Sequence, residues 1–236
     1  DVSVDRYLDG SVNVENIGFS VAPTGIKFSH EKEGVIPSVI RQYYDERKII
    51  KKEMLRLQQE QQSGDSKELD NKITALNNQQ MAIKILMNSL YGALGNRWFR
   101  YFDQRVAESI TLAGQLAIKW AERAVNNEMQ KLLNTDEDYV VAIDTDSVYI
   151  RMGNLVDHFS PKNPVKFLDK ICSEHFEPVL DKAYQQLADM TCAYTNRMEM
   201  GREVIADRGI WMAKKRYILN VHNNEGVQYA KPKLKM

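Results

Sequence analysis

The sequence lacks long hydrophobic runs and is poor in cysteine. No stretch approaches the roughly 18 uninterrupted apolar residues of a membrane-spanning helix, so no segment is expected to cross a membrane. The two cysteines, Cys172 and Cys192, have no metal-ligand spacing, and we expect them to be buried thiols in a reducing cytoplasm. Residues 1–6 contain neither an initiator Met nor a signal-peptide pattern, which suggests a fragment or a processed piece.

An excess of one charge is also absent, because 32 basic residues balance 32 acidic ones. Zero net charge argues against a nucleic-acid partner only where the charges are evenly mixed, and here they are segregated. Residues 41–56 hold six cations against three acids, and residues 214–236 hold six cations against Glu225 alone. Such local fields act on a phosphate ligand more than the total charge does. A solvated helix face explains the first cluster equally well, whereas the second lies on strand-like sequence.

With 236 residues, the chain is long enough for one large domain or two small ones. Helical periodicity runs from about residue 35 to residue 62, with Pro37 in the first turn, where its missing N–H costs nothing. A turn is predicted at residues 63–66, and a second helix from Lys67 onward. Two long helices joined by so short a turn form an antiparallel hairpin, which could be a packing device alone.

The second helix carries an unusual polar face. On a helical wheel, five polar or aromatic residues fall within about 80° of one another, with apolar residues on the opposite arc. They are Asn77, Gln80, Lys84, Asn88 and Tyr91. A solvated face would carry more charges and no tyrosine. One cation for a phosphate and one flat ring for stacking suit a nucleotide, and Gly92 permits close approach.

Two carboxylates, Asp144 and Asp146, lie between two apolar β-branched runs. Residues 140–143 and 148–150 are each typical of a strand, and the first is expected to be buried. On an extended backbone, residues i and i+2 point the same way, so two negative groups would share one face. A divalent cation between them would offset their repulsion. A tight turn with no metal is the alternative, because Asp-Thr-Asp-Ser also suits a turn.

Near the C-terminus, residues 210–221 predict one strand. Its alternation would place Lys215 and Tyr217 on one face, with Lys214 and Arg216 on the other. Strands separated by helices, together with antiparallel hairpins, predict an α+β fold.

Three motifs resemble those of family B DNA polymerases, and they occur in that family's order. The run from Lys84 to Gly92 is similar to the fingers-helix pattern K-x-x-x-N-S-x-Y-G. Asp144-Thr-Asp-Ser is similar to the palm carboxylate motif, and Lys214-Lys-Arg-Tyr is similar to the primer-binding K-K-R-Y. Flanking stretches, including residues 34–37 and 90–101, resemble the branch that contains the replicative polymerases of T-even-type bacteriophages.

The resemblance implies a DNA-directed DNA polymerase (EC 2.7.7.7), a nucleotidyltransferase of DNA replication that adds dNTPs to a primer 3′ end. The implied architecture is an antiparallel-sheet palm with packed helices and an inserted two-helix fingers hairpin. Residues 1–34 would be the N-terminal part of the palm, residues 35–96 the fingers, and residues 97–236 the rest of the palm. If the protein is viral, the resemblance places it in the cytoplasm of the host cell.

The resemblance also implies a role for each matching residue. Two Mg²⁺ ions are expected, with Asp146 as the stronger ligand and Asp144 as the accessory one. The residues implied to contact the nucleotide are Arg47, Lys51, Lys84, Asn88, Tyr91 and Gly92. Those implied to hold the primer are Lys214, Lys215, Arg216 and Tyr217.

The sequence departs from the family pattern in two ways. Ala142-Ile143 stand where the family has Tyr-Gly, and the upstream palm motif, an Asp followed by S-L-Y-P-S, is not in this sequence. Exonuclease and thumb sequences are not in it either, so we expect a palm-and-fingers piece that is inactive alone. Its expected partners are primer-template DNA, dNTP, the missing polymerase parts and, through those parts, a sliding clamp.

Two other functional classes fit these residues less well. A non-catalytic module that binds DNA or a partner protein would not require the acidic pair. A two-metal nuclease would not explain the row of cations that suits a triphosphate.

Overall fold

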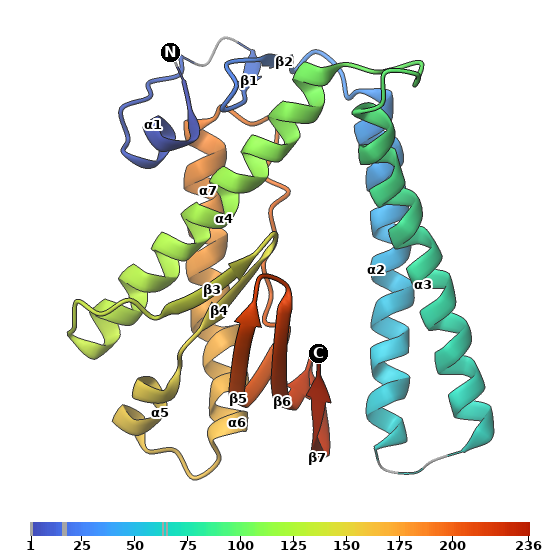
Figure 1. Ribbon diagram of the computed structural model, residues 1–236, viewed down its shortest axis with the longest axis vertical. Coiled ribbons are helices and arrows are strands. Elements are labelled where there is room, and N and C mark those ends of the chain that lie inside the picture. Colours follow the sequence, from blue (N-terminus) through green and yellow to red (C-terminus); the bar gives the residue numbers. More distant parts are fainter. Residues whose placement is uncertain (1, 16–17, 63, 65) are drawn as a thin grey trace. The chain divides into compact units, whose positions relative to one another are not determined.

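The computed structural model describes residues 2–15, 18–62, 64 and 66–236. In this part of the chain, helices alternate with three small antiparallel sheets, which confirms the predicted α+β class. The chain forms two compact units, each built from two stretches (Figure 1). Unit 1 comprises Asp1–Glu31 and Arg105–Arg202, and unit 2 comprises Lys32–Gln104 and Glu203–Met236.

The core of unit 1 is built on two amphipathic helices, α4 (Gln104–Leu133) and α7 (Glu177–Met190). Their apolar residues recur at three- and four-residue spacing and are almost fully buried: Ala117, Ala121, Val125 and Met129 on α4, and Leu180, Tyr184 and Leu187 on α7. Across this core, the Trp120 Nε1 donates a hydrogen bond of 2.8 Å to the carbonyl oxygen of Ala183. Burial of this set therefore holds the unit together.

Shorter elements complete unit 1. Helix α1 (Val4–Leu8) buries Tyr7 in the same core, and its hydroxyl donates a 3.0 Å hydrogen bond to the carbonyl oxygen of Val21. Strands β1 (Phe19–Val21) and β2 (Lys27–Ser29) pair with each other. Helix α5 (Gly153–Phe159) follows the central hairpin. Helix α6 (Pro164–Ile171) continues through the π-helix η1 (Cys172–Phe176) into α7, which accommodates Pro178 in its first turn.

The second hairpin of unit 1 contains the paired carboxylates. Strand β3 (Val140–Asp144) pairs antiparallel with β4 (Ser147–Ile150), which confirms the two strands predicted there. The register shifts between Val140 and Ala142, so β3 contains a bulge close to its start.

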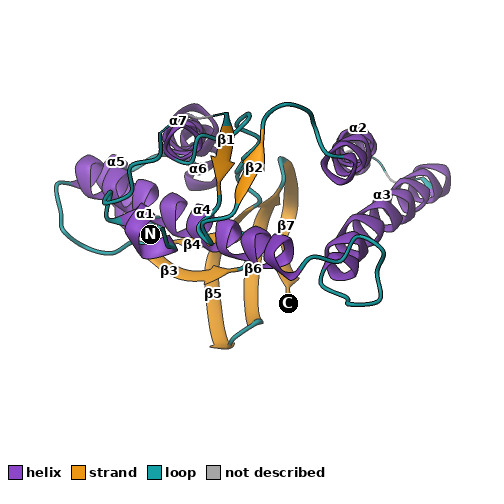
Figure 2. Cartoon of the chain, turned by 90° about the horizontal axis from the view of Figure 1, so that it is seen from above, coloured by secondary structure: helices purple, strands orange, loops and turns teal. Residues whose placement is uncertain are grey.

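The core of unit 2 contains the predicted helical hairpin, α2 (Val35–Gln61) and α3 (Lys67–Leu94), which lie side by side in Figures 1 and 2. Ser66 caps α3, since its Oγ accepts a 3.1 Å hydrogen bond from the backbone N–H of Leu69. Ser63 and Asp65 of the predicted turn lie outside the described residues.

Each of these helices turns one stripe of residues away from solvent. The stripe recurs at three- and four-residue spacing, as in an antiparallel coiled coil. On α2 it contains Ile36, Ile40, Tyr43, Arg47, Ile50, Met54 and Leu57, and on α3 Ile73, Leu76, Gln80, Ile83, Met87, Leu90 and Leu94. One polar residue on each helix, Arg47 and Gln80, interrupts an otherwise apolar seam. The structure thus corrects the predicted wheel of α3, because Gln80 is only 5% exposed.

The sheet of unit 2 has the order β5 (Val204–Ala213), β6 (Arg216–Asn224) and β7 (Val227–Lys235), all antiparallel. The prediction of a single strand over residues 210–221 is therefore wrong. A two-residue turn at Lys214-Lys215 separates β5 from β6, and Lys215 has a φ of 62°. The prediction that Lys214 and Lys215 lie on opposite faces of one strand is therefore also wrong, because both residues lie in the turn.

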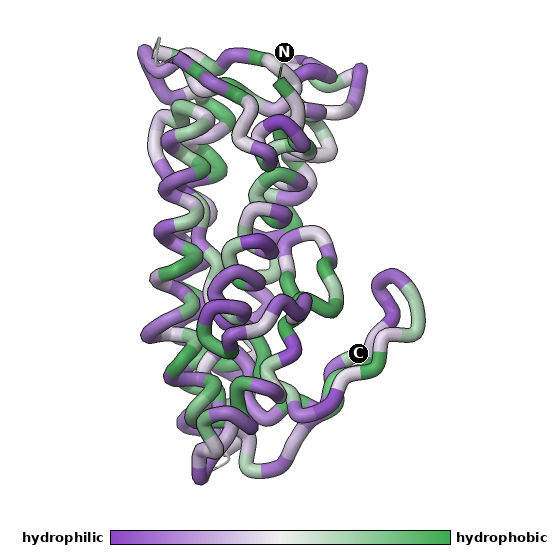
Figure 3. Tube along the Cα trace, turned by 90° about the vertical axis from the view of Figure 1, so that its left-hand side faces the viewer, coloured by the Kyte–Doolittle hydropathy of each residue, from purple (hydrophilic) through white to green (hydrophobic). Residues whose placement is uncertain are grey.

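Hydrophilic and hydrophobic residues alternate along the helices in Figure 3, as amphipathic segments require. Among the described residues, no helix is both long and apolar enough to span a membrane. Cys172 and Cys192 are free thiols, half-buried rather than fully buried as predicted. Burial nevertheless raises the pKa of the Cys172 thiol to about 11, so this group stays protonated at neutral pH.

Candidate functional site

The β3–β4 hairpin is fixed at its base. Val140 and Ile150 pack against the core of unit 1. The Asn126 side chain of α4 accepts hydrogen bonds from the backbone N–H groups of Tyr139 (2.9 Å) and Val140 (3.2 Å). The backbone N–H of Arg151 closes the base by donating to the carbonyl oxygen of Tyr139 at 2.8 Å. Helix α4 therefore determines where the strands begin and how the hairpin is aimed.

Asp144 and Asp146 lie at the opposite end, in the turn. Asp144 pairs with Ser147, so Thr145 and Asp146 are the two residues between the strands. The backbone N–H of Asp146 donates to the carbonyl oxygen of Asp144 at 2.7 Å, an i→i+2 hydrogen bond that closes a three-residue turn. The Thr145 hydroxyl donates to the Asp144 Oδ1 at 3.1 Å. The tight-turn chemistry and the carboxylate pair thus occur together.

Thr145 adopts an energetically unfavourable backbone conformation in this turn. Its φ is 57°, in the left-handed region that β-branched residues rarely adopt. Such a conformation costs on the order of 1–3 kcal/mol and is concentrated at functional sites. Asp144 is half-buried and Asp146 is exposed, so the turn presents one carboxylate fully to solvent.

The expectation that residues 140–143 form a buried strand is only half correct. The strand exists, but Val141 is 52% exposed and Ile143 is 38% exposed. A two-stranded sheet packed on one helix layer has a second face, and these side chains lie on it. Ala142 and Ile143, which replace the family's Tyr-Gly, fall in regular strand directly before Asp144.

The donor chemistry of the tip fits a hard divalent cation. Carboxylate oxygens are the ligands that Mg²⁺ prefers, and an exposed turn lets the ion keep several of its waters. Within the described ranges, no group of three or more His, Cys, Asp or Glu side chains is placed to hold a metal ion. The described residues therefore bring a pair of carboxylates to this place, not a closed metal cage.

The predicted triphosphate cations lie on the α2–α3 hairpin, and Arg47 is fixed within the seam. Its Nε donates a 3.1 Å hydrogen bond to the Gln80 Oε1. The Gln80 amide in turn donates to the Asn77 Oδ1 at 3.0 Å. Holding a guanidinium through Nε sets its plane while its two terminal nitrogens remain suited to a bidentate contact with phosphate.

Lys51 lies one turn after Arg47 on α2 and has a different partner. Its Nζ is 2.5 Å from the Glu225 Oε1, a carboxylate in the turn between β6 and β7. Both side chains are half-buried. This contact could not be predicted from the sequence, because the two residues are 174 positions apart.

The remaining predicted nucleotide residues share an exposed face of α3. Lys84, Asn88 and Tyr91 are all exposed, at spacings of four and three residues. Gly92 follows them, and a Cβ placed on it would meet nothing within 4 Å, so its space is open in this structure. This face could receive a flat base beside a phosphate-binding cation.

The predicted primer-binding residues gather at the tip of the β5–β6 hairpin. Lys214 and Lys215 form the turn, Arg216 begins β6, and these three are exposed while Tyr217 is half-buried. A hairpin tip with three successive cations suits the phosphates of a nucleic-acid strand.

Gly209 supports this tip and is not among the predicted site residues. A Cβ at Gly209 would lie 2.7 Å from two carbons of the Trp211 indole and 2.8 Å from the Leu219 Cδ2. Only glycine lets the indole lie across the strand at this point. Gly209 directly precedes the strand predicted over residues 210–221, and a glycine in or beside a strand is the signal that could have revealed it.

A second missed feature is the segment after α3, where aromatic and basic residues alternate. Trp98 is 87% exposed, and the Arg100 guanidinium lies 5.7 Å from the centroid of the Tyr101 ring. Exposed rings among cations are typical of surfaces that bind single-stranded nucleic acid. The alternation in Arg97-Trp-Phe-Arg-Tyr101 was visible in the sequence.

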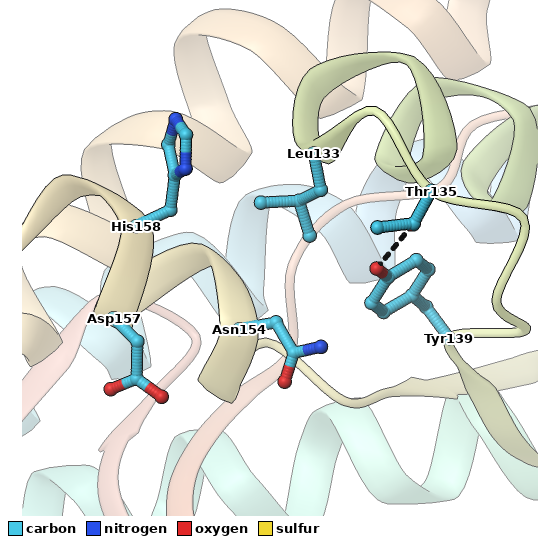
Figure 4. Close-up of a pocket in the computed structure, with 6 residues that line it drawn as sticks. All are labelled: Leu133, Thr135, Tyr139, Asn154, Asp157 and His158. Atoms are coloured by element: carbon cyan, nitrogen blue, oxygen red, sulfur yellow. Dashed lines mark hydrogen bonds between the residues drawn. The ribbon is translucent and has the colours of Figure 1, made fainter.

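A shallow hollow of about 330 Å³ lies near the base of the β3–β4 hairpin in unit 1. It is lined by Leu133, Thr135, Tyr139, Asn154, Asp157 and His158, and Figure 4 shows Asp157 and His158 pointing away from each other. The one hydrogen bond drawn, 2.7 Å between the hydroxyls of Thr135 and Tyr139, closes a loop. Neither Asp144 nor Asp146 lines this hollow.

Comparison with known proteins identifies the family. The sequence matches DNA polymerase family B over residues 5–233. The chain belongs to this family. It is 33% identical over 286 residues to the DNA-directed DNA polymerase of Escherichia phage RB69, covering 98% of this chain and 32% of that protein. It is 32% identical over 289 residues to that of Enterobacteria phage T4, covering 99% and 32%.

A more distant relative is DNA polymerase 1 of Pyrococcus abyssi, 28% identical over 211 residues, with 89% of this chain and 23% of that polymerase covered. The chain thus spans about a third of the length of the two phage polymerases, or 32%. The alignment with the RB69 polymerase has 286 positions, whereas this family B chain has 236 residues. Within the aligned region, the phage enzyme therefore contains additional residues that have no counterpart in this chain.

Proposed function

We propose that this family B chain is the palm-and-fingers part of a DNA-directed DNA polymerase that extends a primer by two-metal-ion nucleotidyl transfer. The fingers would be residues 35–96, with the palm on either side. The observation that carries the proposal is the β3–β4 tip, where Asp144 and Asp146 are presented together by a hairpin fixed to the core.

The tip supplies oxygen ligands for Mg²⁺, with Asp146 as the principal ligand and Asp144 as the accessory one. When bound, a pair of Mg²⁺ ions supplies Lewis acidity toward the attacking hydroxyl and the phosphate oxygens. Thr145 holds the two carboxylates in one turn, and its hydroxyl steadies Asp144. Exposure of Asp146 lets it reach an ion that still carries water.

Arg47, Lys51 and Lys84 would neutralise the triphosphate. Gln80 orients the Arg47 guanidinium, and Lys84 projects from the neighbouring helix into solvent. Asn88, Tyr91 and Gly92 continue the Lys84 face and would line the base pair being formed. Because these groups lie on two rigid helices, one nucleotide can contact all of them only in a defined orientation.

The primer strand would bind at Lys214, Lys215, Arg216 and Tyr217, where three exposed cations meet one ring. Primer-template DNA and dNTP are the proposed partners, together with the remaining parts of the polymerase and, through them, a sliding clamp. The cations contact the sugar-phosphate backbone and not the base edges, so binding here is expected to be independent of sequence and sensitive to salt.

The 236-residue chain is expected to extend no primer alone, because the described residues bring only a carboxylate pair to the tip. The test is incorporation of labelled dNTP on primed DNA with Mg²⁺, with and without the polypeptide that carries the upstream carboxylate motif. Synthesis that requires both polypeptides supports the proposal. Robust synthesis by the pure chain would falsify the incomplete-site explanation.

The same lack of a third metal-binding side chain favours one alternative, a non-catalytic module that binds DNA or a partner protein. Such a module would bind primed DNA through the β5–β6 tip, but adding the upstream polypeptide would produce no synthesis.

A further inference from the structure

The contact between Lys51 and Glu225 joins two elements of unit 2 that are remote in sequence. The 2.5 Å ion pair is half-buried, with the side chains of Lys51 and Glu225 31% and 19% exposed. A second bond lies two helical turns further along α2, where the backbone N–H of Gln228 donates to the Gln59 Oε1 at 3.0 Å. The β6–β7 turn is therefore attached along α2 at two points.

The turn that carries Glu225 is well defined. Asn224 pairs with Val227, and the two residues between them, Glu225 and Gly226, have φ values of 50° and 89°. Positive φ at both central positions is the mark of a type I′ turn. Asn223, 1% exposed, fixes it by accepting a 3.0 Å hydrogen bond from the Gly226 N–H.

Glutamate is an unfavourable choice at this position. The first central residue of a type I′ turn is usually Asn, Asp or Gly, because these tolerate positive φ. A glutamate at this position adopts a positive φ that is unfavourable for its backbone, and no interaction within the described residues of this turn offsets this cost. The longer side chain of Glu225 lets its carboxylate extend from the turn to the ammonium group of Lys51 on α2.

Two other cations of α2, Arg41 and Arg56, form ion pairs with acids close in sequence. Arg56 pairs with Glu53 and Glu60 on its own helix, and Arg41 pairs with Glu33, eight residues away. The Arg56 pair with Glu53 is exposed on both sides and the Arg41 pair on its arginine side, so salt largely screens them. The Lys51 pair is less exposed and therefore less screened. It also involves one of the cations assigned to the triphosphate.

We propose that Glu225 is a positioning residue that occupies Lys51 in the nucleotide-free chain and competes with the triphosphate of a dNTP for it. The inference rests on the proposed function of Lys51. A triphosphate that reaches Lys51 must displace the carboxylate or lie beside it, and either event costs binding free energy. Glu225 thus weakens nucleotide binding and ties α2 to β6, the strand that begins with Arg216.

The first test compares dATP binding to the wild-type chain and to Glu225→Gln by isothermal titration calorimetry. Removing the competing charge should tighten binding about three- to tenfold. In Lys51→Ala, dATP binding should be weaker, and adding Glu225→Gln should then change it little. A general electrostatic effect of the lost charge would instead persist without Lys51, so the double-mutant cycle separates the two.

A second variant separates competition from stability. Glu225→Asn places a residue that prefers positive φ in the turn, so the thermal midpoint should stay equal or rise while dATP binding tightens as in Glu225→Gln. Glu53→Gln is the matched control, because it removes one negative charge from α2 two residues from Lys51, where its partner is Arg56. That control should leave dATP affinity unchanged.

Unchanged or weaker dATP binding in both Glu225 variants overturns the proposal, as does failure of every variant to bind dATP. The failure of the proposed function has a different pattern. In that case Lys84→Ala and Lys51→Ala would leave dATP binding equal to wild type. If those two substitutions weaken binding while the Glu225 variants do not tighten it, the nucleotide site stands and the competition is refuted.

Discussion

The β3–β4 tip and the α2–α3 seam place charged groups in two different ways. At the tip, Asp144 and Asp146 are presented by backbone geometry, with the Thr145 hydroxyl donating to Asp144. In the seam, Arg47 is held by the side chain of Gln80, which Asn77 holds in turn. One region uses a strained turn and the other uses a chain of amides. The comparison shows that a local motif can determine the first kind of placement, whereas the second requires the tertiary fold.

A physical reason underlies the difference. A carboxylate that binds a partly hydrated cation must stay accessible, so packing side chains around it would be counterproductive. A guanidinium that makes a bidentate contact with phosphate benefits from a fixed plane, and a hydrogen bond to Nε provides it. The tip should therefore be sensitive to changes of charge and of backbone freedom, and the seam to changes of side-chain partners.

The largest effect is expected at Asp146. In polymerase reconstituted with the upstream palm motif, Asp146→Asn should abolish synthesis, because a neutral amide is a much poorer Mg²⁺ ligand. The same change should preserve or slightly tighten metal-free DNA binding, since under the proposed function it removes a negative charge that would repel the primer phosphates. Asp144→Asn should reduce the rate less. Single-turnover extension, alongside DNA titrations in EDTA, measures both effects.

The control for this pair is Asp157→Asn, which neutralises an exposed carboxylate on α5 of the same unit and should keep wild-type synthesis. A turn with no metal role would make both Asp144→Asn and Asp146→Asn nearly silent, since Asn serves in turns about as well as Asp. Wild-type synthesis by Asp146→Asn would therefore refute the metal assignment.

The next effect is expected at Lys84, on the exposed face of α3. Lys84→Ala should weaken dNTP use about ten- to a hundredfold, the equivalent of about 1.5–3 kcal/mol for one charge-assisted contact, while primer-template binding stays nearly intact. Lys72→Ala is the matched control on the same helix, since Lys72 pairs with Glu68 one turn away. If DNA affinity falls and nucleotide kinetics do not change, this face contacts DNA instead.

A smaller effect is expected where the seam depends on side-chain partners. Gln80→Leu should lower the free energy of unfolding by about 1–3 kcal/mol, because it leaves the Arg47 guanidinium without its partner in a partly buried seam. Adding Arg47→Leu should recover most of that loss, since an apolar pair suits the rest of the stripe. Urea unfolding of the chain measures both, with exposed Gln79→Leu as the control. Equal stability of all these variants would show that the pair contributes little.

The elements predicted correctly have local causes. The helices α2 and α3 follow from three- and four-residue apolar spacing and from Ser66 as a cap, and β3 and β4 follow from β-branched runs around a turn. These signals lie within a few residues of the structure they specify. The family motifs added the candidate site residues, whose assigned roles stay proposals.

The wrong and missing predictions involve distant contacts or unusual turns. Nothing in Lys214-Lys215 resembles a preferred turn dipeptide, so the break between β5 and β6 was not predicted. Gln80 looked like a surface amide because its partner, Arg47, is 33 residues away. Val141 and Ile143 looked buried because the sequence does not specify that one face of the hairpin lies open.

The smallest effect on stability, and the sharpest test of the comparison, is expected at Thr145. Thr145→Gly removes the strain of a positive φ, worth about 1–2 kcal/mol, but adds unfolded-state entropy worth roughly 0.5–1 kcal/mol. Because these two effects oppose each other, the free energy of unfolding should change by only about 1 kcal/mol or less.

Synthesis by the reconstituted Thr145→Gly polymerase should still fall, because the turn that holds Asp144 and Asp146 loses its restraint and its hydroxyl donor. We expect the loss in kcat and not in the KM for dNTP, since the cations that we propose bind the nucleotide lie on α2 and α3. Thr145→Ser keeps the donor and should retain most of the kcat. If Thr145→Gly matches wild type in kcat, backbone restraint does not position the carboxylates, and the contrast between the tip and the seam does not hold.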